Sequence, residues 1–186
     1  MSRALVLLAP GFEEIEALSV VDILRRGGVT TVMAAVAPSL EIVGAHGICV
    51  KADVPFEDVE EEEFDALILP GGGEGTANLK ASDAVIERLR RQKEEGRLIC
   101  AICAAPTILS YAGVLDPDQH VTCYPTCIMD LDRKAASVPV VADGNVITGQ
   151  APGAAMLFGL VILHALGNVA LMHRVARELV TDVLEH

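Results

Sequence analysis

The sequence has very few aromatic residues. Of its 186 residues only two are Tyr and four are Phe, and Trp is absent. A core must therefore be built from Val, Ile, Leu and Ala, as is typical of parallel sheets buried on both faces. Basic residues are also scarce, with 14 against 26 acidic ones and a net charge of −12. Because phosphate backbones are bound by clustered Lys and Arg, we expect no nucleic acid or anionic membrane surface as a partner.

Long apolar runs are missing as well. No stretch approaches the roughly 20 apolar residues that span a bilayer. The short apolar segment 4–8 is followed by Pro10-Gly11 and charged residues without an A-x-A-like site, so a buried first strand explains it better than a secretion signal. An odd number of cysteines, five, agrees with a reducing compartment. We therefore expect a soluble cytoplasmic protein.

Strand and helix patterns alternate along the whole chain, without repeats or linkers. The expected strands are 4–8, 30–37, 41–43, 48–52, 66–69, 98–102, 138–141 and 146–148, and the expected helices are 13–26, 83–95, 104–112, 153–166 and 169–184, with Asn168 as a cap. The acidic run 57–63 is expected to be a solvated, helix-starting connection, and not a cation site. The alternation predicts one α/β domain over residues 1–186, with a mostly parallel, doubly wound sheet.

Cys103 stands where an apolar strand turns at once into a helix, in Ala101-Ile102-Cys103-Ala104-Ala105-Pro106. A nucleophile at such a turn is held on an exposed, strained elbow. The helix N-terminus would favour the thiolate and lower the pKa of the cysteine. A buried structural cysteine is the alternative.

Two further turns follow strands whose carboxyl ends would meet that of the Cys103 strand, where ligands of such sheets bind. The glycines of Leu69-Pro70-Gly71-Gly72-Gly73-Glu74-Gly75 could let successive N–H groups hold an oxyanion, or could form a tight turn without a ligand. Thr76 replaces the third glycine of a dinucleotide fingerprint, and no Gly-Lys-Ser/Thr follows, so neither nucleotide motif is present.

Glu16 lies one helical turn after Glu13 and can face the same end of the sheet. A carboxyl group pressed into a partly apolar site beside a thiolate would have a raised pKa. It could then stay protonated and donate a hydrogen bond to sulfur.

Four motifs, at 9–16, 69–72, 101–106 and 151–153, stand together in the order expected of the ThiJ/PfpI superfamily. The sequence most resembles the branch of the Parkinson-associated protein deglycase (DJ-one) and its ThiJ-like relatives, from Arg3 to about Leu184. The resemblance implies a flavodoxin-like, doubly wound three-layer sandwich and a homodimer. It implies that Cys103 is the nucleophile and Glu16 its protonated partner. It also implies an oxyanion site made by Gly71, Gly72 and Ala104.

The same resemblance places Tyr124, Cys123 and Pro152 at the lining of the site. Tyr124 stands where human-type members carry a histidine, so that general-base help from an imidazole is absent there. His46 stands where many members carry an arginine near the dimer interface, which could make anion binding weaker or pH-dependent. The peptidase branch has a histidine directly after its cysteine, whereas this chain has Ala104, and the His-x-Glu of the amidotransferase branch is missing.

The remaining cysteines allow other interpretations. Cys100 and Cys103 with Cys123 and Cys127 superficially resemble a four-cysteine zinc site. Cys100, however, lies within the apolar strand, on the face opposite Cys103, which argues against zinc and against a thioredoxin-like disulfide. Cys123 is either a resolving thiol or an inert loop cysteine.

The function implied is that of a cysteine-dependent glyoxalase or deglycase. It would act on small reactive carbonyls such as methylglyoxal, releasing a 2-hydroxy acid such as lactate, with no metal or organic cofactor. The alternative is a redox-sensing stress protein or chaperone in which Cys103 is oxidised to sulfinic acid. Both hypotheses use one site, so the sequence does not separate them.

Overall fold

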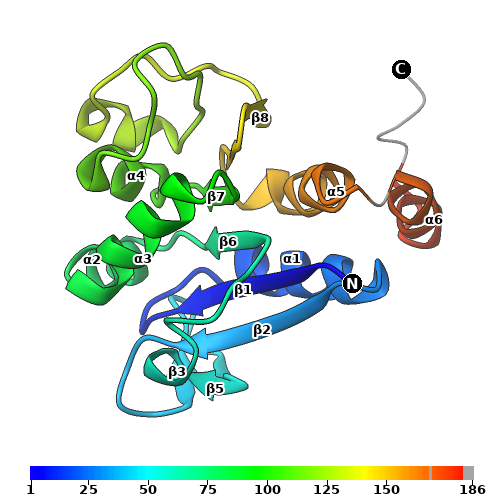
Figure 1. The fold of residues 1–186 in the computed structure, drawn as a ribbon, viewed down its shortest axis with the longest axis horizontal. Helices are drawn as coiled ribbons and strands as arrows, with labels where there is room; N and C mark the ends of the chain where they lie inside the picture. The colour runs from blue at the N-terminus through cyan, green and yellow to red at the C-terminus, as the bar shows by residue number, and fades with distance from the viewer. Residues whose placement is uncertain (168, 182–186) are drawn as a thin grey trace.

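The computed structural model describes residues 1–167 and 169–181, which build a seven-stranded sheet (Figure 1). Its strands, in spatial order, are β5 (Val54–Pro55), β2 (Thr30–Ala35), β1 (Arg3–Leu8), β6 (Ala66–Leu69), β7 (Leu98–Ile102), β9 (Val146–Gly149) and β8 (Val140–Asp143). Every neighbouring pair is parallel except β8 and β9. The central order β2-β1-β6-β7-β9 is the flavodoxin-like order. The predicted mostly parallel, doubly wound sheet is therefore confirmed.

Helices cover both faces of this sheet. On one face lie α1 (Glu14–Arg26), α5 (Ala155–Ala165) and α6 (Val169–Glu178), and on the other α2 (Gly73–Lys80), α3 (Asp83–Glu94) and α4 (Pro106–Ala112). Alternate side chains of each strand enter two separate cores. In β6, for example, Ile68 packs on the α1 side while Leu67 and Leu69 pack on the α3 side. The expected three-layer sandwich follows from this alternation.

A small hairpin of β3 (Glu41–Val43) and β4 (Cys49–Lys51) stands apart from the main sheet. It docks onto the segment that follows β1, where the N–H of Gly11 donates to the carbonyl of Val43 (2.8 Å) and the N–H of Ala45 donates to that of Phe12 (2.8 Å). The hairpin thereby lies beside the start of α1.

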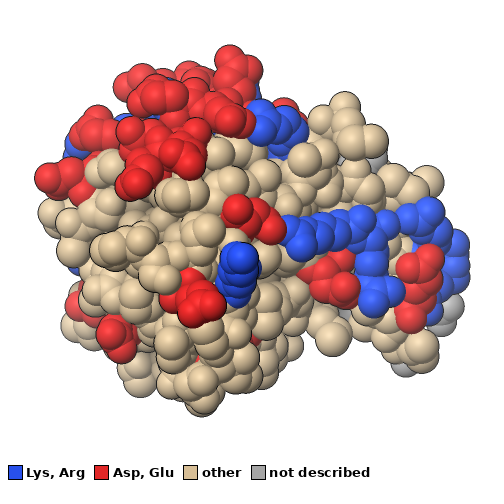
Figure 2. All heavy atoms as spheres, turned by 90° about the horizontal axis from the view of Figure 1, so that it is seen from below, with Lys and Arg blue, Asp and Glu red and all other residues tan. Residues whose placement is uncertain are grey.

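Residues 57–63 form an exposed acidic connection, as expected, but contain only the end of the short 3-10 helix η1 (Phe56–Asp58). Three of its carboxylates are paired with arginines, in the pairs Glu61–Arg91, Glu62–Arg3 and Glu63–Arg97. On the face drawn in Figure 2, acidic side chains crowd toward one end of the molecule, and most of the Lys and Arg seen there lie toward the end of α6. The three ion pairs fasten the connection to β1, to α3 and to the residue that precedes β7.

Several boundaries differ from the prediction. α4 begins at Pro106 and not at Ala104, since Cys103–Ala105 form a turn. α2 was not predicted, because glycines at 73 and 75 hide a helix whose Glu74 and Lys80 suit its dipole. β2 ends at Ala35, and β8 spans Val140–Asp143 instead of 138–141. α6 ends at Glu178, while the predicted cap Asn168 and residues 182–184 lie outside the described residues.

None of the helices in ranges 1–167 and 169–181 combines the length and apolar character that a membrane span requires.

Candidate active site

Three turns meet at the carboxyl ends of the adjacent strands β1, β6 and β7. They are the segments that follow Leu8, Leu69 and Ile102. In the flavodoxin-like order, the crevice beside β1 is the switch point at which ligands of such sheets bind. The predicted meeting of these three motifs is therefore a property of the topology.

Cys103 occupies a strained turn. Its φ is +66°, in the left-handed region that non-glycine residues seldom adopt. The surrounding backbone enforces this turn, because the N–H of Cys103 donates to the carbonyl of Gly149 (2.9 Å) and its carbonyl accepts from the N–H of Tyr124 (2.8 Å). The strained elbow is confirmed, but the Cys103 residue is only 9% exposed. The expectation of an exposed thiol was wrong.

Glu16 is fully enclosed, with 0% exposure, and its position is set by two hydrogen bonds. Its N–H donates to Oε2 of Glu13 (2.8 Å), and its own Oε2 accepts from the N–H of Gly71 (2.7 Å). Its other oxygen, Oε1, has no hydrogen-bond partner among the described residues. This carboxyl group is thus held by one oxygen and leaves the other without a partner.

Gly71 and Gly72 leave the space in which the acid and the thiol meet. A Cβ on Gly71 would lie 2.6 Å from Oε2 of Glu16 and 2.7 Å from Cβ of Cys103. Gly72 has φ +89°, and a Cβ there would lie 2.3 Å from the carbonyl oxygen of Gly11. Both positions require glycine, one for close approach and the other also for its backbone conformation.

The pKa values of Glu16 and Cys103 are both raised. Burial raises the pKa of Glu16 to about 7, although hydrogen bonding with Cys103 and Gly71 opposes the rise. Burial, followed by the charge and hydrogen bonding of Glu16, raises the pKa of the Cys103 thiol to about 12, although the amides of Ala104 and Gly72 oppose it. Between these two values the pair holds one proton.

The raised pKa of Glu16 agrees with the prediction, whereas the lowered pKa predicted for Cys103 was wrong. The physical reason is local. α4 starts three residues after Cys103 and has only seven residues, so its dipole gives the sulfur little help, while burial and the neighbouring carboxylate both oppose a second negative charge.

The backbone amides divide into two roles. Those of Gly72 and Ala104 face the sulfur, where an oxyanion would form next to it. The amide of Gly71 is already bonded to Glu16. Of the three predicted oxyanion donors, the geometry therefore leaves two for that task and gives Gly71 the task of orienting the acid.

The segment after Val121 lies beside the nucleophile. Tyr124, 40% exposed, is tied to the carbonyl of Cys103 by its N–H. A further contact of this segment was not predicted from the sequence: the N–H of Thr122 donates to Oγ1 of the fully buried Thr148 (2.9 Å). A polar residue amid the apolar strand pattern of 146–149 was the available signal. Pro152 begins η3 (Pro152–Ala154), shortly after β9, and no hydrogen bond of the described residues joins it to Cys103.

The other cysteines have distinct places. Cys123 is buried, its thiol donates to the carbonyl of Tyr124, and burial raises its pKa to about 11, which disfavours a resolving role. Cys100 is fully enclosed and shares the α1-side core with Cys103. The expected opposite faces were wrong, because Cys103 leaves the strand alternation at its left-handed turn. Cys49 is exposed and Cys127 half-buried.

His46 lies on the hairpin and contacts the start of α1. Its Nδ1 lies 2.9 Å from Oε2 of Glu14, and this hydrogen bond raises the pKa of the imidazole. Burial acts to raise the pKa of Glu14, but hydrogen bonds from His46 and Ile48 outweigh it and lower that pKa. Ligand atoms of Glu13, Glu14 and His46 lie within 4.8 Å of one another, the one such metal-type group among the described residues. Backbone N–H groups already occupy both carboxylates: that of Glu16 bonds Glu13, which caps α1, and that of His46 bonds Glu14, which docks the hairpin.

Comparison with known proteins identifies relatives along most of the chain. A model of the DJ-1/PfpI family matches residues 2–165. Protein dj-1beta of Drosophila melanogaster is 36% identical over 95% of both chains, and a deglycase of Pyrococcus abyssi is 33% identical over 81% of this chain and 91% of its own. Protein DJ-1 homolog A of Arabidopsis thaliana is 39% identical over 87% of this chain, which spans only 41% of that relative's length.

Solved structures agree with these relatives. A structure described as oxidized DJ-1 of Toxoplasma gondii superposes with a TM-score of 0.94 at 32% identity, covering 98% of this chain and all of the other. The crystal structure of Drosophila DJ-1beta superposes with a TM-score of 0.93 at 36% identity, covering 97% and 99%. The predicted flavodoxin-like α/β fold is confirmed.

Proposed function

Because the chain belongs to the DJ-1/PfpI family, we propose that it is a cysteine-dependent, cofactor-independent enzyme of the glyoxalase and deglycase type. Its substrates would be small reactive carbonyls such as methylglyoxal, and its role the removal of carbonyl stress. The observation that carries the proposal is the placement of the Cys103 thiol against Glu16, whose Oε1 is free to exchange a proton. The relative from Pyrococcus abyssi is named a deglycase, which supports the proposal.

In the first step Cys103 attacks the aldehyde carbon of methylglyoxal. The S–C bond forms as the thiol proton passes to Glu16, whose pKa near 7 makes it a base at neutral pH. The amides of Gly72 and Ala104, which face the sulfur, would hold the oxygen that becomes negative. Return of the proton to that oxygen gives a hemithioacetal.

In the second step Glu16 moves a proton between the two former carbonyl carbons. Its carboxylate removes the proton of the sulfur-bearing carbon and, through an enediol, returns a proton to the neighbouring carbon, which leaves a thioester. Water then cleaves the S–C bond, releasing lactate and restoring the thiol. Atoms balance as methylglyoxal plus water to lactic acid. No oxidant or reductant is consumed, since one carbon is oxidised as its neighbour is reduced.

The direct test measures methylglyoxal consumption without glutathione and follows the product to lactate. Cys103→Ser should abolish turnover, whereas Cys127→Ser, which removes a half-buried cysteine of η2 (Pro125–Asp130), should retain it. Turnover that survives in Cys103→Ser would contradict the mechanism.

A second function, redox sensing, is favoured by the same two amides. A sulfinate on Cys103 would be held by the Gly72 and Ala104 N–H groups and by protonated Glu16. Although burial raises the pKa of the Cys103 thiol, the Glu16 carboxylate can accept its proton as peroxide attacks, so peroxide should oxidise Cys103 before the exposed Cys49, as mass spectrometry would report. Faster oxidation of Cys49 together with measurable turnover would leave the enzyme as the function.

We also propose that the protein works as a homodimer through the hairpin. Ile15 on α1 and Val43 and Ile48 on the hairpin are large apolar residues exposed beside the docked Glu14 and His46. Exposed apolar residues grouped in this way mark interaction surfaces. Sedimentation should give a dimer, and Ile48→Asp should convert it to a monomer. A monomeric native protein would contradict the proposal.

A further inference from the structure

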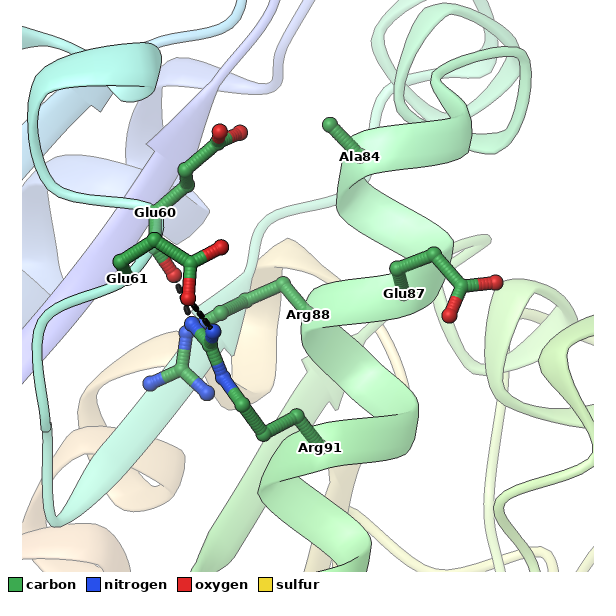
Figure 3. A pocket seen from close by; sticks show the side chains of 6 residues that line it. All are labelled: Glu60, Glu61, Ala84, Glu87, Arg88 and Arg91. Atoms are coloured by element: carbon green, nitrogen blue, oxygen red, sulfur yellow. Dashed lines mark hydrogen bonds and ion pairs between the residues drawn. The ribbon is translucent and has the colours of Figure 1, made fainter.

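A pocket that includes none of the residues of the Cys103 site lies between the acidic connection and α3. It encloses about 290 Å³ and is lined by Glu60, Glu61, Ala84, Glu87, Arg88 and Arg91 (Figure 3). α3 covers the face of the sheet opposite α1, the helix that carries Glu16. Nothing in the proposed reaction uses these residues.

Arg88 is the unusual member of this pocket, because it is an arginine with only 2% exposure. Its Nη2 donates to the carbonyl of Glu62 (3.3 Å), but Nε and Nη1 find no acceptor among the described residues. A guanidinium group does not lose its proton in proteins. A buried, incompletely bonded charge is costly, so Arg88 calls for an acceptor that enters the pocket.

The charges around Arg88 are already matched in pairs. Glu61 is paired with Arg91, which also donates to the carbonyl of Glu60, and Glu87 is paired with Arg90 (2.6 Å). No ion pair of the described residues involves the side chain of Arg88 or of Glu60. One cation and one anion of the pocket therefore remain without a partner.

The two unmatched charges lie apart. Figure 3 shows the guanidinium of Arg88 next to that of Arg91, whereas the carboxylate of half-buried Glu60 turns away from them, toward the end of the pocket where Ala84 lies. Ala84 contributes only a methyl group, which leaves room between the helix and the connection. A ligand that satisfies both charges must bear both an acceptor group and a cation.

We propose that this pocket binds a small zwitterion of the free α-amino acid type, with its carboxylate on Arg88 and its ammonium group on Glu60. Guanidinium–carboxylate pairs are among the strongest hydrogen-bonded pairs in proteins. A simple anion would meet three surrounding carboxylates, and a simple cation would meet the buried guanidinium group. The proposal is independent of the Cys103 chemistry.

Calorimetry with L-alanine as the probe tests this assignment on the full chain. We expect a Kd on the order of 1 mM, which is reasonable for so small a ligand. Propionate carries only the carboxylate and ethylamine only the ammonium group, and each should bind at least tenfold more weakly than alanine. The proposal is overturned if alanine shows no binding, or if propionate or inorganic phosphate binds as tightly as alanine.

Variants locate the binding. Arg88→Met and Glu60→Gln should each weaken alanine binding at least tenfold, while Glu94→Gln, an exposed acid of the same helix outside the pocket, should change it less than twofold. Glu60 is on a surface connection, so its variant decides the matter independently of any effect of Arg88→Met on the fold. Undiminished alanine binding in Glu60→Gln would refute the assignment.

Discussion

Glu16 and Arg88 are both almost fully buried, and among the described residues Glu16 leaves one polar atom without a partner and Arg88 leaves two, yet burial affects their charges in different ways. Glu16 can shed its charge, because burial raises its pKa to about 7. Arg88 cannot, since a guanidinium stays protonated under all conditions in which the fold exists. The Glu16 site can therefore change its protonation state near neutral pH, whereas the charge of Arg88 requires a hydrogen-bond acceptor.

Their surroundings explain the difference. Glu16 is fixed by backbone groups of the turns after β1 and β6, and its carboxyl group lies beside the strained Cys103. An acid with a pKa close to the working pH is suited to moving protons. Arg88 sits among side chains of a helix and a surface connection, which could rearrange around a ligand. Burial alone therefore does not identify a function. The function depends on whether the buried group can become neutral or must keep its charge.

The largest effect expected concerns turnover. Glu16→Gln keeps the shape of the side chain and the acceptor for Gly71 but removes the base, so kcat/KM for methylglyoxal should fall by about 10³ or more. Glu94→Gln, the exposed acid of α3, is the matched control and should keep its rate. A Glu16→Gln enzyme within tenfold of the native rate would show that Glu16 has no part in proton transfer.

Stability should change next most. At pH 8 both Glu16→Gln and Arg88→Met remove a buried charge, so both should increase the free energy of unfolding in urea. We expect up to roughly 3 kcal/mol for Glu16→Gln, from the difference between its ordinary pKa of 4.5 and about 7. For Arg88→Met we expect about 1–4 kcal/mol, as when buried ionic groups are replaced by apolar ones.

The stability gains of the two variants should differ at acidic pH. A carboxyl group whose pKa is raised by folding contributes stability that is fully present below its unfolded value, near 4.5, and lost as the pH rises through about 7. At pH 5 Glu16 is mostly neutral in the folded state, so the gain from Glu16→Gln should largely vanish. The gain from Arg88→Met should persist. Equal gains from Glu16→Gln at both pH values would mean that Glu16 stays ionised when folded.

Much of this arrangement was predictable, because it depends on order along the chain. Alternating strands and helices dictate a parallel sheet, and the motifs after β1, β6 and β7 must then meet at one edge. The raised pKa of Glu16 was also predictable, because a carboxyl group was expected in a partly apolar site beside a thiol. That residues 1–186 form one domain stays a prediction.

What the sequence did not reveal depends on a few ångströms of packing. The pKa of Cys103 turned on whether the helix began at Ala104 or Pro106 and on how deeply the thiol was buried. α2 was hidden by its two glycines, of which Gly75 serves a close contact with Phe12 rather than flexibility. Arg88 reads as one of several charges on an amphipathic helix, and only the fold shows that it points inward.

Glycine substitutions offer a smaller and more local test. Gly71→Ala would press a methyl group onto Glu16 and Cys103, so we expect a loss of about 1–3 kcal/mol in unfolding free energy. Gly73→Ala, two residues later at the start of α2, meets open space and should be stabilising by about 0.4–1 kcal/mol. Denaturant curves measure both. Equal effects at the two positions would show that the site is not closely packed at Gly71.

The smallest effect expected is the shape of the pH profile. In the free enzyme the reactive pair holds a single proton, a state that is populated above a pKa of about 7, where Glu16 becomes the base that accepts the thiol proton. The value of kcat/KM should therefore rise as the pH passes through about 7 and fall about tenfold per unit below it.

The imidazole of His46, whose pKa is raised by Glu14, is the competing source of such an inflection. The inflection should survive in His46→Gln, because His46 contacts the helix start and not the thiol. Loss of the inflection in that variant would show that it arises from His46 on the hairpin and not from the buried Glu16.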